Sequence, residues 1–217
     1  MHSIKIVSDV SCPWCIIGYQ ALQLAIIESG LQDEVEINWK PFELNPTMPV
    51  EGQDRAEHIQ QKYGLTVEQG IANRQNLINR GLELGYEFSF PEDGRVYNTF
   101  NAHRLIHWAA EFDKQTELKL SLFDLYFKEA GNPSSEADLL SCVESVGLDS
   151  TLAKEVLNSE RYADEVRNDQ QWNSQQGITA VPAFIFNNKF LVSGGQPKET
   201  FVKVFEELTK NDADNVA

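Results

Sequence analysis

Two cysteines separated by two residues are the part of this 217-residue sequence whose spacing most directly indicates chemistry, Cys12-Pro13-Trp14-Cys15. If a helix begins at this motif, the first sulfur lies at its amino end and the second lies one turn inside. The unpaired N–H groups and the positive end of the helix dipole then favour a thiolate over a thiol. We therefore expect Cys12 to have a depressed pKa and to attack disulfides, and Cys15 to resolve the mixed disulfide that results.

Zinc binding is the main alternative chemistry for this pair. A structural zinc site needs four ligands, but the third cysteine, Cys142, stands alone in the sequence. His103 and His107 are four residues apart, yet they lack the His-Glu-x-x-His pattern of a zinc enzyme. We therefore expect no metal, and an inert pair of buried thiols is the other alternative. Cys142 lies among apolar residues at helical spacing, which predicts a small core residue.

The elements that must position the pair can be predicted from the spacing of apolar residues. Residues 4–8 form a short β-rich run, and residues 13–29 carry apolar side chains at helical spacing, with Gly30 as a C-terminal cap. Residues 35–40 alternate between apolar and polar and end at a proline. This order predicts a βαβ unit with parallel strands, and with the cysteines at the start of its helix.

The rest of the sequence predicts a long helical insertion followed by a return to α/β structure. Helical periodicity holds through about residue 159, and Thr66, Ser135 and Asp149 can cap helices within it. A helix over residues 160–176, two strands around Asn187-Asn188 and a last helix complete the order. We predict one discontinuous α/β domain of residues 1–48 and 160–217, interrupted by an all-helical domain of residues 49–159.

The amino-acid composition argues against several classes of function. Hydrophobic residues make up 41% of the chain, so it can bury a core, and 33 acidic against 18 basic residues give a net charge of −15. Such a surface repels phosphate backbones and anionic lipid, which argues against nucleic-acid or membrane partners. Three cysteines are too few for a secreted disulfide scaffold. The first residues lack the features of a signal peptide, so we expect a cytoplasmic protein.

Five segments in order along nearly the whole chain resemble the FrnE-type branch of the DsbA-like thioredoxin superfamily. They are residues 8–18, 41–46, 98–105, 177–184 and 193–197. The resemblance implies a thioredoxin fold, βαβ … αββα, interrupted by a large all-helical insertion. It also implies a thiol–disulfide oxidoreductase, or a disulfide isomerase, that acts on proteins or small thiols. Such an enzyme needs no cofactor beyond its redox-active Cys12–Cys15 disulfide, with glutathione as a candidate co-substrate.

The resemblance further implies which residues contact the substrate. Pro182 is expected to be cis and to lie across from Cys12, where the Val181 backbone can pair with an extended substrate chain. Pro13 and Trp14 are expected to contact the substrate beside the cysteines. Without the cysteine pair, Val181-Pro182 would be an ordinary strand entry.

Two residues of the predicted insertion helix have alternative interpretations. His103 and Arg104 could line the groove above Cys12 and present positive charge to a thiolate or to an anionic substrate such as glutathione. Alternatively, His103 is an exposed or partly hydrogen-bonded helical residue.

Two further families define the alternatives. Kappa-class glutathione transferases and 2-hydroxychromene-2-carboxylate isomerases resemble this architecture but typically carry Ser at the position of Cys12. Their chemistry, a glutathione-dependent transfer or isomerisation, is the alternative function, and retention of both cysteines favours redox exchange. A holdase-like binding module is the non-enzymatic alternative.

Thioredoxins proper commonly have a buried acid at the position of Ile6. Here Asp9 either assists proton transfer or simply ends the strand.

Overall fold

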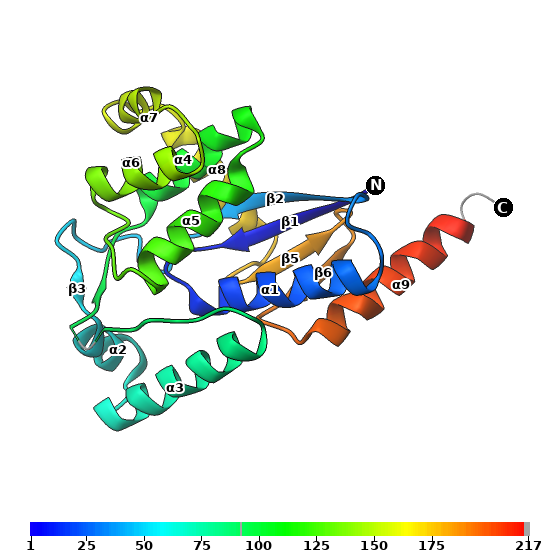
Figure 1. Ribbon diagram of the computed structural model, residues 1–217, viewed down its shortest axis with the longest axis horizontal. Helices are drawn as coiled ribbons and strands as arrows, with labels where there is room; N and C mark the ends of the chain where they lie inside the picture. Colours follow the sequence, from blue (N-terminus) through cyan, green and yellow to red (C-terminus); the bar gives the residue numbers. More distant parts are fainter. Residues whose placement is uncertain (92, 215–217) are drawn as a thin grey trace.

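The fold is built on a four-stranded sheet in the strand order β2-β1-β5-β6 (Figure 1). A computed structural model describes residues 1–91 and 93–214. The strands are β1 (His2–Ser8), β2 (Val35–Pro41), β5 (Ala183–Phe186) and β6 (Phe190–Ser193). The β1 and β2 strands are parallel, as the predicted βαβ unit requires, while β5 and β6 run antiparallel to their neighbours.

Apolar alternation sets the register of the central strand. Ile4 and Ile6 of β1 are fully buried, and Ile6 pairs with Trp39 on one side and Phe184 on the other. Because successive side chains of a strand point to opposite faces, a one-residue slip would expose these side chains. The hairpin between β5 and β6 turns at Asn187 and Asn188, whose φ angles of 49° and 54° confirm the predicted turn.

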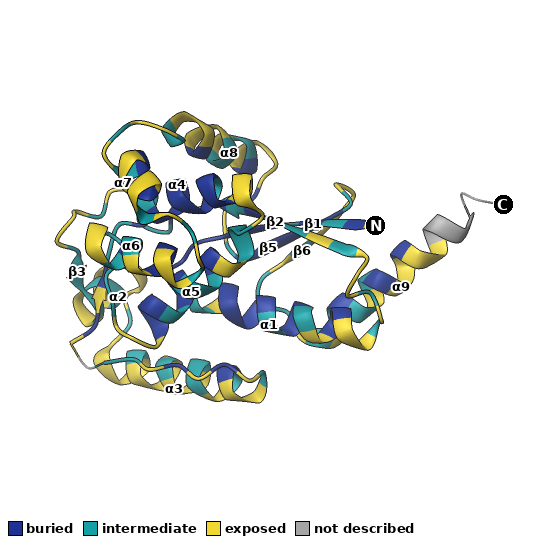
Figure 2. Cartoon of the chain, turned by 45° about the horizontal axis from the view of Figure 1, so that its top comes forward, coloured by how far each residue is buried: buried dark blue, intermediate teal, exposed yellow. Residues whose placement is uncertain are grey.

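Two helices that pack against each other cover one face of the sheet, α1 (Pro13–Glu28) and α9 (Lys198–Asp214) (Figure 1). Pro13 occupies the first position of α1, where its missing N–H breaks no helical hydrogen bond. The helix ends at Ser29, and Gly30 then takes the left-handed conformation that was predicted for it, with φ of 69°. Figure 2 shows that α1 is buried along most of its length.

Helices fill most of the chain between β2 and β5; those before residue 160 lie in the predicted insertion, and the last lies in the segment predicted to belong to the α/β domain. They are α2 (Arg55–Tyr63), α3 (Val67–Glu83), α4 (Phe100–Ala109), a 3₁₀ turn (Ala110–Phe112), α5 (Gln115–Phe127), α6 (Glu136–Ser145), α7 (Ser150–Leu157) and α8 (Ala163–Gln175). The predicted caps are confirmed, because the side chains of Thr66, Ser135 and Asp149 accept backbone hydrogen bonds at the starts of α3, α6 and α7.

The insertion lies beside the sheet and reaches its edge. Helices α4, α5 and α8 all contact β2, and α5 also contacts α1. A two-residue ladder joins β3 (Gln53–Asp54) to β4 (Arg95–Val96), a feature that the sequence did not predict in a segment expected to be all helical. The α/β thioredoxin fold with a largely helical insertion is otherwise confirmed. None of the described helices is long and apolar enough to cross a membrane.

Gly18 sets how closely α1 approaches β5. A Cβ atom at Gly18 would lie 2.8 Å from the Cζ atom of Phe184 and 3.3 Å from the Cγ atom of Pro182. The Phe184 ring is fully buried and packs 4.9 Å from Phe201, centroid to centroid, so it has little room to move. The absence of a side chain at Gly18 therefore keeps the Val181–Pro182 segment close to α1.

We expect Gly18→Ala to destabilise the protein despite the better helix propensity of alanine. Overpacking a core typically costs about 1–3 kcal/mol, against a helix-propensity gain of about 1 kcal/mol. Gly70 in α3 is the matched control, because a Cβ there meets nothing within 4 Å. Urea denaturation should show a lower midpoint for Gly18→Ala and a slightly higher one for Gly70→Ala. Equal upward shifts would contradict the packing role of Gly18.

Candidate active site

The two cysteines lie where the sequence predicts them, at the amino end of α1. Cys12 is the N-cap residue, with extended backbone angles of φ −95° and ψ 110°, and Cys15 lies one turn inside the helix. Both are free thiols; Cys12 is 4% exposed and Cys15 is completely buried. Cys12 is therefore the less buried of the two residues.

A loop from the other end of the chain lies against Cys12. The Val181–Pro182 peptide is cis, as the family resemblance implies, and the Cys12 thiol donates to the Val181 carbonyl oxygen at 3.7 Å. The Pro182 carbonyl accepts a hydrogen bond of 2.8 Å from the Gly194 amide, which ties this loop to the end of β6. Val181 itself is only partly buried. The expected juxtaposition of Cys12 with Val181 and Pro182 is thus present.

The two residues between the cysteines differ in their exposure to solvent. Pro13 is half-buried, whereas Trp14 is 39% exposed. Gly195 packs against the Trp14 ring so closely that a Cβ there would lie 2.9 Å from its Cε3 atom. Trp14 therefore forms part of the surface beside Cys12, next to the chain that follows β6.

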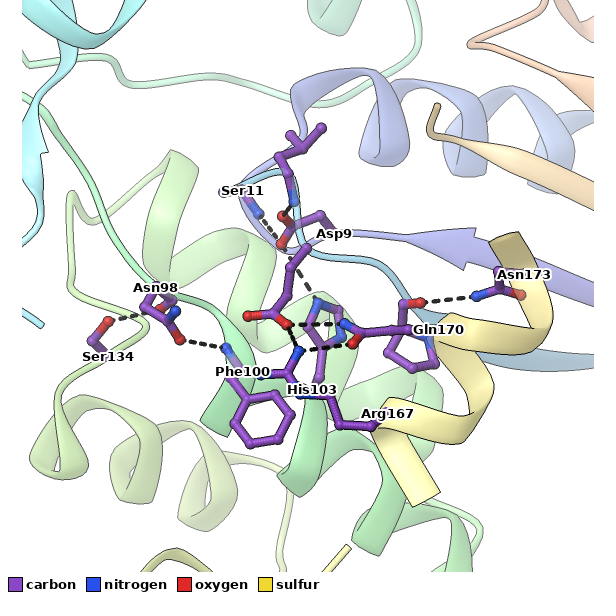
Figure 3. Close-up of polar contacts among 12 residues, drawn as sticks. Asp9, Ser11, Asn98, Phe100, His103, Ser134, Arg167, Gln170 and Asn173 are labelled. Carbon is purple, nitrogen blue, oxygen red and sulfur yellow. Dashed lines mark hydrogen bonds and ion pairs between the residues drawn. The ribbon is translucent and has the colours of Figure 1, made fainter. Parts of the chain in front are cut away.

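Asp9, three residues before Cys12, is the centre of a buried polar network (Figure 3). Its Oδ1 atom accepts from the Ser11 amide at 3.2 Å, and its Oδ2 atom accepts from the Leu44 amide at 2.7 Å. The Nε2 atom of His103 lies 3.5 Å from Oδ1. Burial opposes ionisation of Asp9, but the contact with His103 and the Leu44 amide outweigh it, so the pKa of Asp9 is lowered. Asp9 does more than end β1, because it joins three segments around the site.

The expected positions of His103 and Arg104 in a substrate groove need correction. His103 is 3% exposed and faces Asp9, so it orients that carboxylate from the interior and has little surface for a substrate. Arg104 is buried as well, and its guanidinium donates to the carbonyl oxygens of Val156 in the last turn of α7 and of Ser159 and Arg161 after it. The sequence shows that both side chains lie on one helix but cannot show that both are turned inward.

A second polar cluster fixes the loop after β2 against α8 (Figure 3). The buried Glu43 carboxylate pairs with Arg167 and accepts a hydrogen bond of 3.0 Å from Gln170. The Arg167 guanidinium lies 3.9 Å from the centroid of the Phe100 ring. This cluster joins the β2 exit loop, α4 and α8, and so supports the Leu44 amide that holds Asp9.

The pKa values of the two thiols run opposite to the expectation for Cys12. The pKa of Cys12 is raised, because its thiol hydrogen-bonds to Cys15, is buried, and faces the charges of Cys15 and Asp9. The pKa of Cys15 is lowered: burial opposes the shift, but hydrogen bonds from Cys12 and Ser8 and the charge of Lys119 outweigh it. These directions favour Cys15 over Cys12 as the sulfur that carries the charge when the pair loses its first proton.

Several residues of the site lie outside those that the sequence pattern singled out. The Ser8 hydroxyl is buried with no other partner in the described part of the chain, which leaves it free to donate to Cys15. Burial and the charge of Cys12 raise the pKa of Tyr63, a 56% exposed residue at the end of α2. The neighbouring Lys62 donates to the Leu44 carbonyl at 2.8 Å. Lys119, whose charge acts on Cys15, is the one lysine of α5 and stands between Leu118 and Leu120, which is the only sequence signal for it.

The site can thus perform thiol chemistry with the residues it contains. Within residues 1–91 and 93–214, no three His, Cys, Asp or Glu side chains are grouped to hold a metal ion. A dithiol at a helix amino end, facing a cis-proline loop on a four-stranded sheet, defines a domain of the thioredoxin class.

Comparison with known proteins gives the family within that class. The chain belongs to the family described as the DSBA-like thioredoxin domain, whose model matches residues 3–206. It is 30% identical over 208 residues to the uncharacterized protein YwbO of Bacillus subtilis, covering 95% of this chain and 97% of that protein.

Solved structures agree with this assignment. The probable DsbA oxidoreductase SCO1869 from Streptomyces coelicolor superposes with a TM-score of 0.89 at 30% identity, covering 95% of this chain and 89% of that one. The cytosolic disulfide reductase DsbM from Pseudomonas aeruginosa, solved with GSH, shares the fold with a TM-score of 0.66 at 14% identity, covering 95% and 99%.

Proposed function

We propose that this protein is a thiol–disulfide oxidoreductase of the FrnE type that exchanges disulfides through Cys12 and Cys15. One observation carries the proposal. Cys12 is the less buried of the two cysteines and lies at the amino end of a helix, with its sulfur 3.7 Å from the Val181 carbonyl oxygen. Membership of a DsbA-like family and the likeness to SCO1869 support the same chemistry.

The proposed reaction has two exchange steps. Cys15, as thiolate, takes the proton of Cys12, and the Cys12 thiolate attacks one sulfur of a substrate disulfide. The substrate S–S bond breaks, and the leaving sulfur departs as a thiolate that takes a proton from water. Cys15 then loses the proton it took up to water, attacks the Cys12 sulfur as a thiolate, forms the Cys12–Cys15 disulfide and releases the second substrate thiolate. Two electrons pass from the protein to the substrate, and a small thiol such as glutathione can return them. The reverse sequence oxidises a dithiol.

The surface around Cys12 suits an extended polypeptide as substrate. The partly buried Val181 backbone can pair with an incoming chain as a neighbouring strand would. Exposed Trp14, directly after Pro13, supplies apolar contact area beside Cys12. We place the enzyme in the cytoplasm, where cellular thiols keep the pair reduced. DsbM, which shares the fold, is a cytosolic disulfide reductase, and this supports the proposed location.

Two assays in parallel separate this function from glutathione-dependent transfer or isomerisation. We expect the wild-type protein to accelerate reduction of insulin disulfides by dithiothreitol or glutathione. The same preparation should not conjugate glutathione to an electrophile such as 1-chloro-2,4-dinitrobenzene. Cys142→Ser is the matched control, because it removes a buried thiol remote from the pair in the sequence and should leave insulin reduction unchanged. Conjugating activity without insulin reduction would support the alternative function.

A further inference from the structure

Trp14 differs from the other three tryptophans of the chain in what surrounds its ring. The rings of Trp39, Trp108 and Trp172 each pack against another aromatic ring or lie under a lysine amine. Within residues 1–91 and 93–214, the Trp14 ring has neither kind of partner, and the residue is 39% exposed. Its exposed face is therefore available to another molecule.

The turn between β6 and α9, Gly194–Gln196, lies against Trp14. A Cβ atom at Gly195 would lie 2.9 Å from the Cε3 atom of the Trp14 ring and 3.3 Å from the Trp14 carbonyl oxygen. The absence of a side chain at Gly195 therefore lets the β6–α9 turn approach both the ring and the first turn of α1. A methyl group there would force the ring or the turn to move.

The same turn is tied to the cis-proline loop. Gly194 has a φ angle of 81°, which favours glycine, and its amide donates to the Pro182 carbonyl oxygen at 2.8 Å. The side-chain amide of Gln196 donates to the last carbonyl oxygen of β6 at 2.8 Å and closes the turn. The β6–α9 turn thus fixes the Trp14 ring relative to the loop that contacts Cys12.

A substrate bonded to Cys12 brings its neighbouring residues within reach of Trp14. Consecutive Cα atoms are about 3.8 Å apart, and Trp14 is two residues from Cys12. A side chain beside the substrate cysteine can therefore contact the exposed ring. Because the ring is large and apolar, burying an apolar side chain against it is favourable, whereas a polar side chain would lose contacts with water.

We propose that the β6–α9 turn positions Trp14, and that the ring so held selects polypeptide substrates with an apolar residue beside the reactive cysteine. The inference deepens the proposed function and rests on it. Gly195 is then a positioning residue that acts through Trp14. Glutathione disulfide is a poorer substrate, because γ-glutamate and glycine flank its cysteine and neither has an apolar side chain.

Two peptide disulfides that differ at one residue measure this preference. The residue beside the cysteine is leucine in one and asparagine, similar in size but polar, in the other. The reduced wild-type protein should react with the leucine peptide about tenfold faster, the lower end of what a hydrophobic contact discriminates. In Trp14→Ala the ratio of the two rate constants should fall to about one. Trp14→Phe keeps an aromatic ring and should retain most of the preference. A changed reactivity of Cys12 itself cancels in the ratio.

Gly195→Ala tests whether the turn acts through the ring. The added methyl group should displace Trp14, so the ratio should fall toward one. Fluorine NMR of protein labelled with fluorotryptophan reports the ring directly, with the Trp14 resonance assigned by its loss in Trp14→Phe. That resonance should shift in Gly195→Ala. Gly70→Ala is the matched control, because a Cβ there meets nothing within 4 Å, and it should change neither the ratio nor the spectrum. If Gly195→Ala does not fold, Gln196→Ala, which opens the same turn, carries both measurements.

The two parts of the proposal fail separately. A wild-type ratio of one, or an unchanged ratio in Trp14→Ala, would overturn the selection by Trp14. An unchanged ratio or an unmoved Trp14 resonance in Gly195→Ala would overturn the positioning role of the turn. Failure of the wild-type protein to react with either peptide would instead reject the proposed function itself.

Discussion

Replacing Cys12 by serine is expected to abolish disulfide exchange, with a loss of roughly 10³-fold or more, the scale seen when an enzyme loses its nucleophile. The substitution is nearly isosteric and keeps a donor for the Val181 carbonyl oxygen, which the Cys12 sulfur contacts at 3.7 Å. It removes the sulfur that bonds to the substrate sulfur in the mixed disulfide. Cys15 cannot take over, because it is completely buried.

Initial rates of insulin reduction measure the effect of Cys12→Ser. A thermal unfolding curve close to that of the wild type shows that the loss is chemical. Cys142→Ser makes the same change at a buried thiol, one that donates to the Ser121 carbonyl at 3.8 Å, and should keep full activity. A Cys12→Ser protein that still reduces insulin at the wild-type rate would remove Cys12 as the nucleophile.

Replacing Cys15 by serine is expected to stop turnover at the mixed disulfide while sparing the first attack. Cys12 remains able to attack a substrate, but no thiol is present one turn inside α1 to release it. Covalent adducts of Cys12 with glutathione or with substrate proteins should therefore accumulate. Intact-mass measurement after incubation with oxidised glutathione detects them. Without such adducts, Cys15 would not be the resolving thiol.

The same variant reports on how the two sulfurs share charge. Hydrogen bonding to Cys15 and the Cys15 charge are among the causes that raise the pKa of Cys12, with the hydrogen bond the largest. A serine hydroxyl stays neutral, so the pKa of Cys12 should fall in Cys15→Ser. The pH dependence of Cys12 alkylation by iodoacetamide should shift to lower pH than in the wild type. A shift to higher pH would show that the reduced pair does not hold its charge on Cys15.

Local signals account for the parts of the fold that the sequence predicts well. Each of these signals fixes the backbone conformation where it stands. They are the capping box that begins at Thr66, the positive φ angles of Asn187 and Asn188, and Pro13 at the first position of α1. The ladder between β3 and β4 escapes such analysis, because each strand has only two residues and the partners are about 40 positions apart. Two residues show no periodicity from which a strand can be inferred.

The candidate site also has features that local sequence predicts and features that depend on how distant elements pack. The roles proposed for the cysteines follow from their spacing and from the helix that begins between them. The inward rotation of His103 toward Asp9 and the burial of Lys119 depend on how α4 and α5 pack against β2, which no local pattern encodes. The direction of the Cys12 pKa was wrong for a similar reason. The helix amino end acts on one sulfur alone, whereas the structure adds its hydrogen bond to Cys15 and the nearby Asp9 carboxylate.

A redox titration in glutathione buffers, read by peptide mass spectrometry, tests the central claim most directly. We predict that Cys12 and Cys15 form one intramolecular disulfide reversibly, with a midpoint between about −270 and −120 mV, while Cys142 stays a thiol throughout. A protein that never links Cys12 to Cys15 at any ratio of reduced to oxidised glutathione would contradict the account.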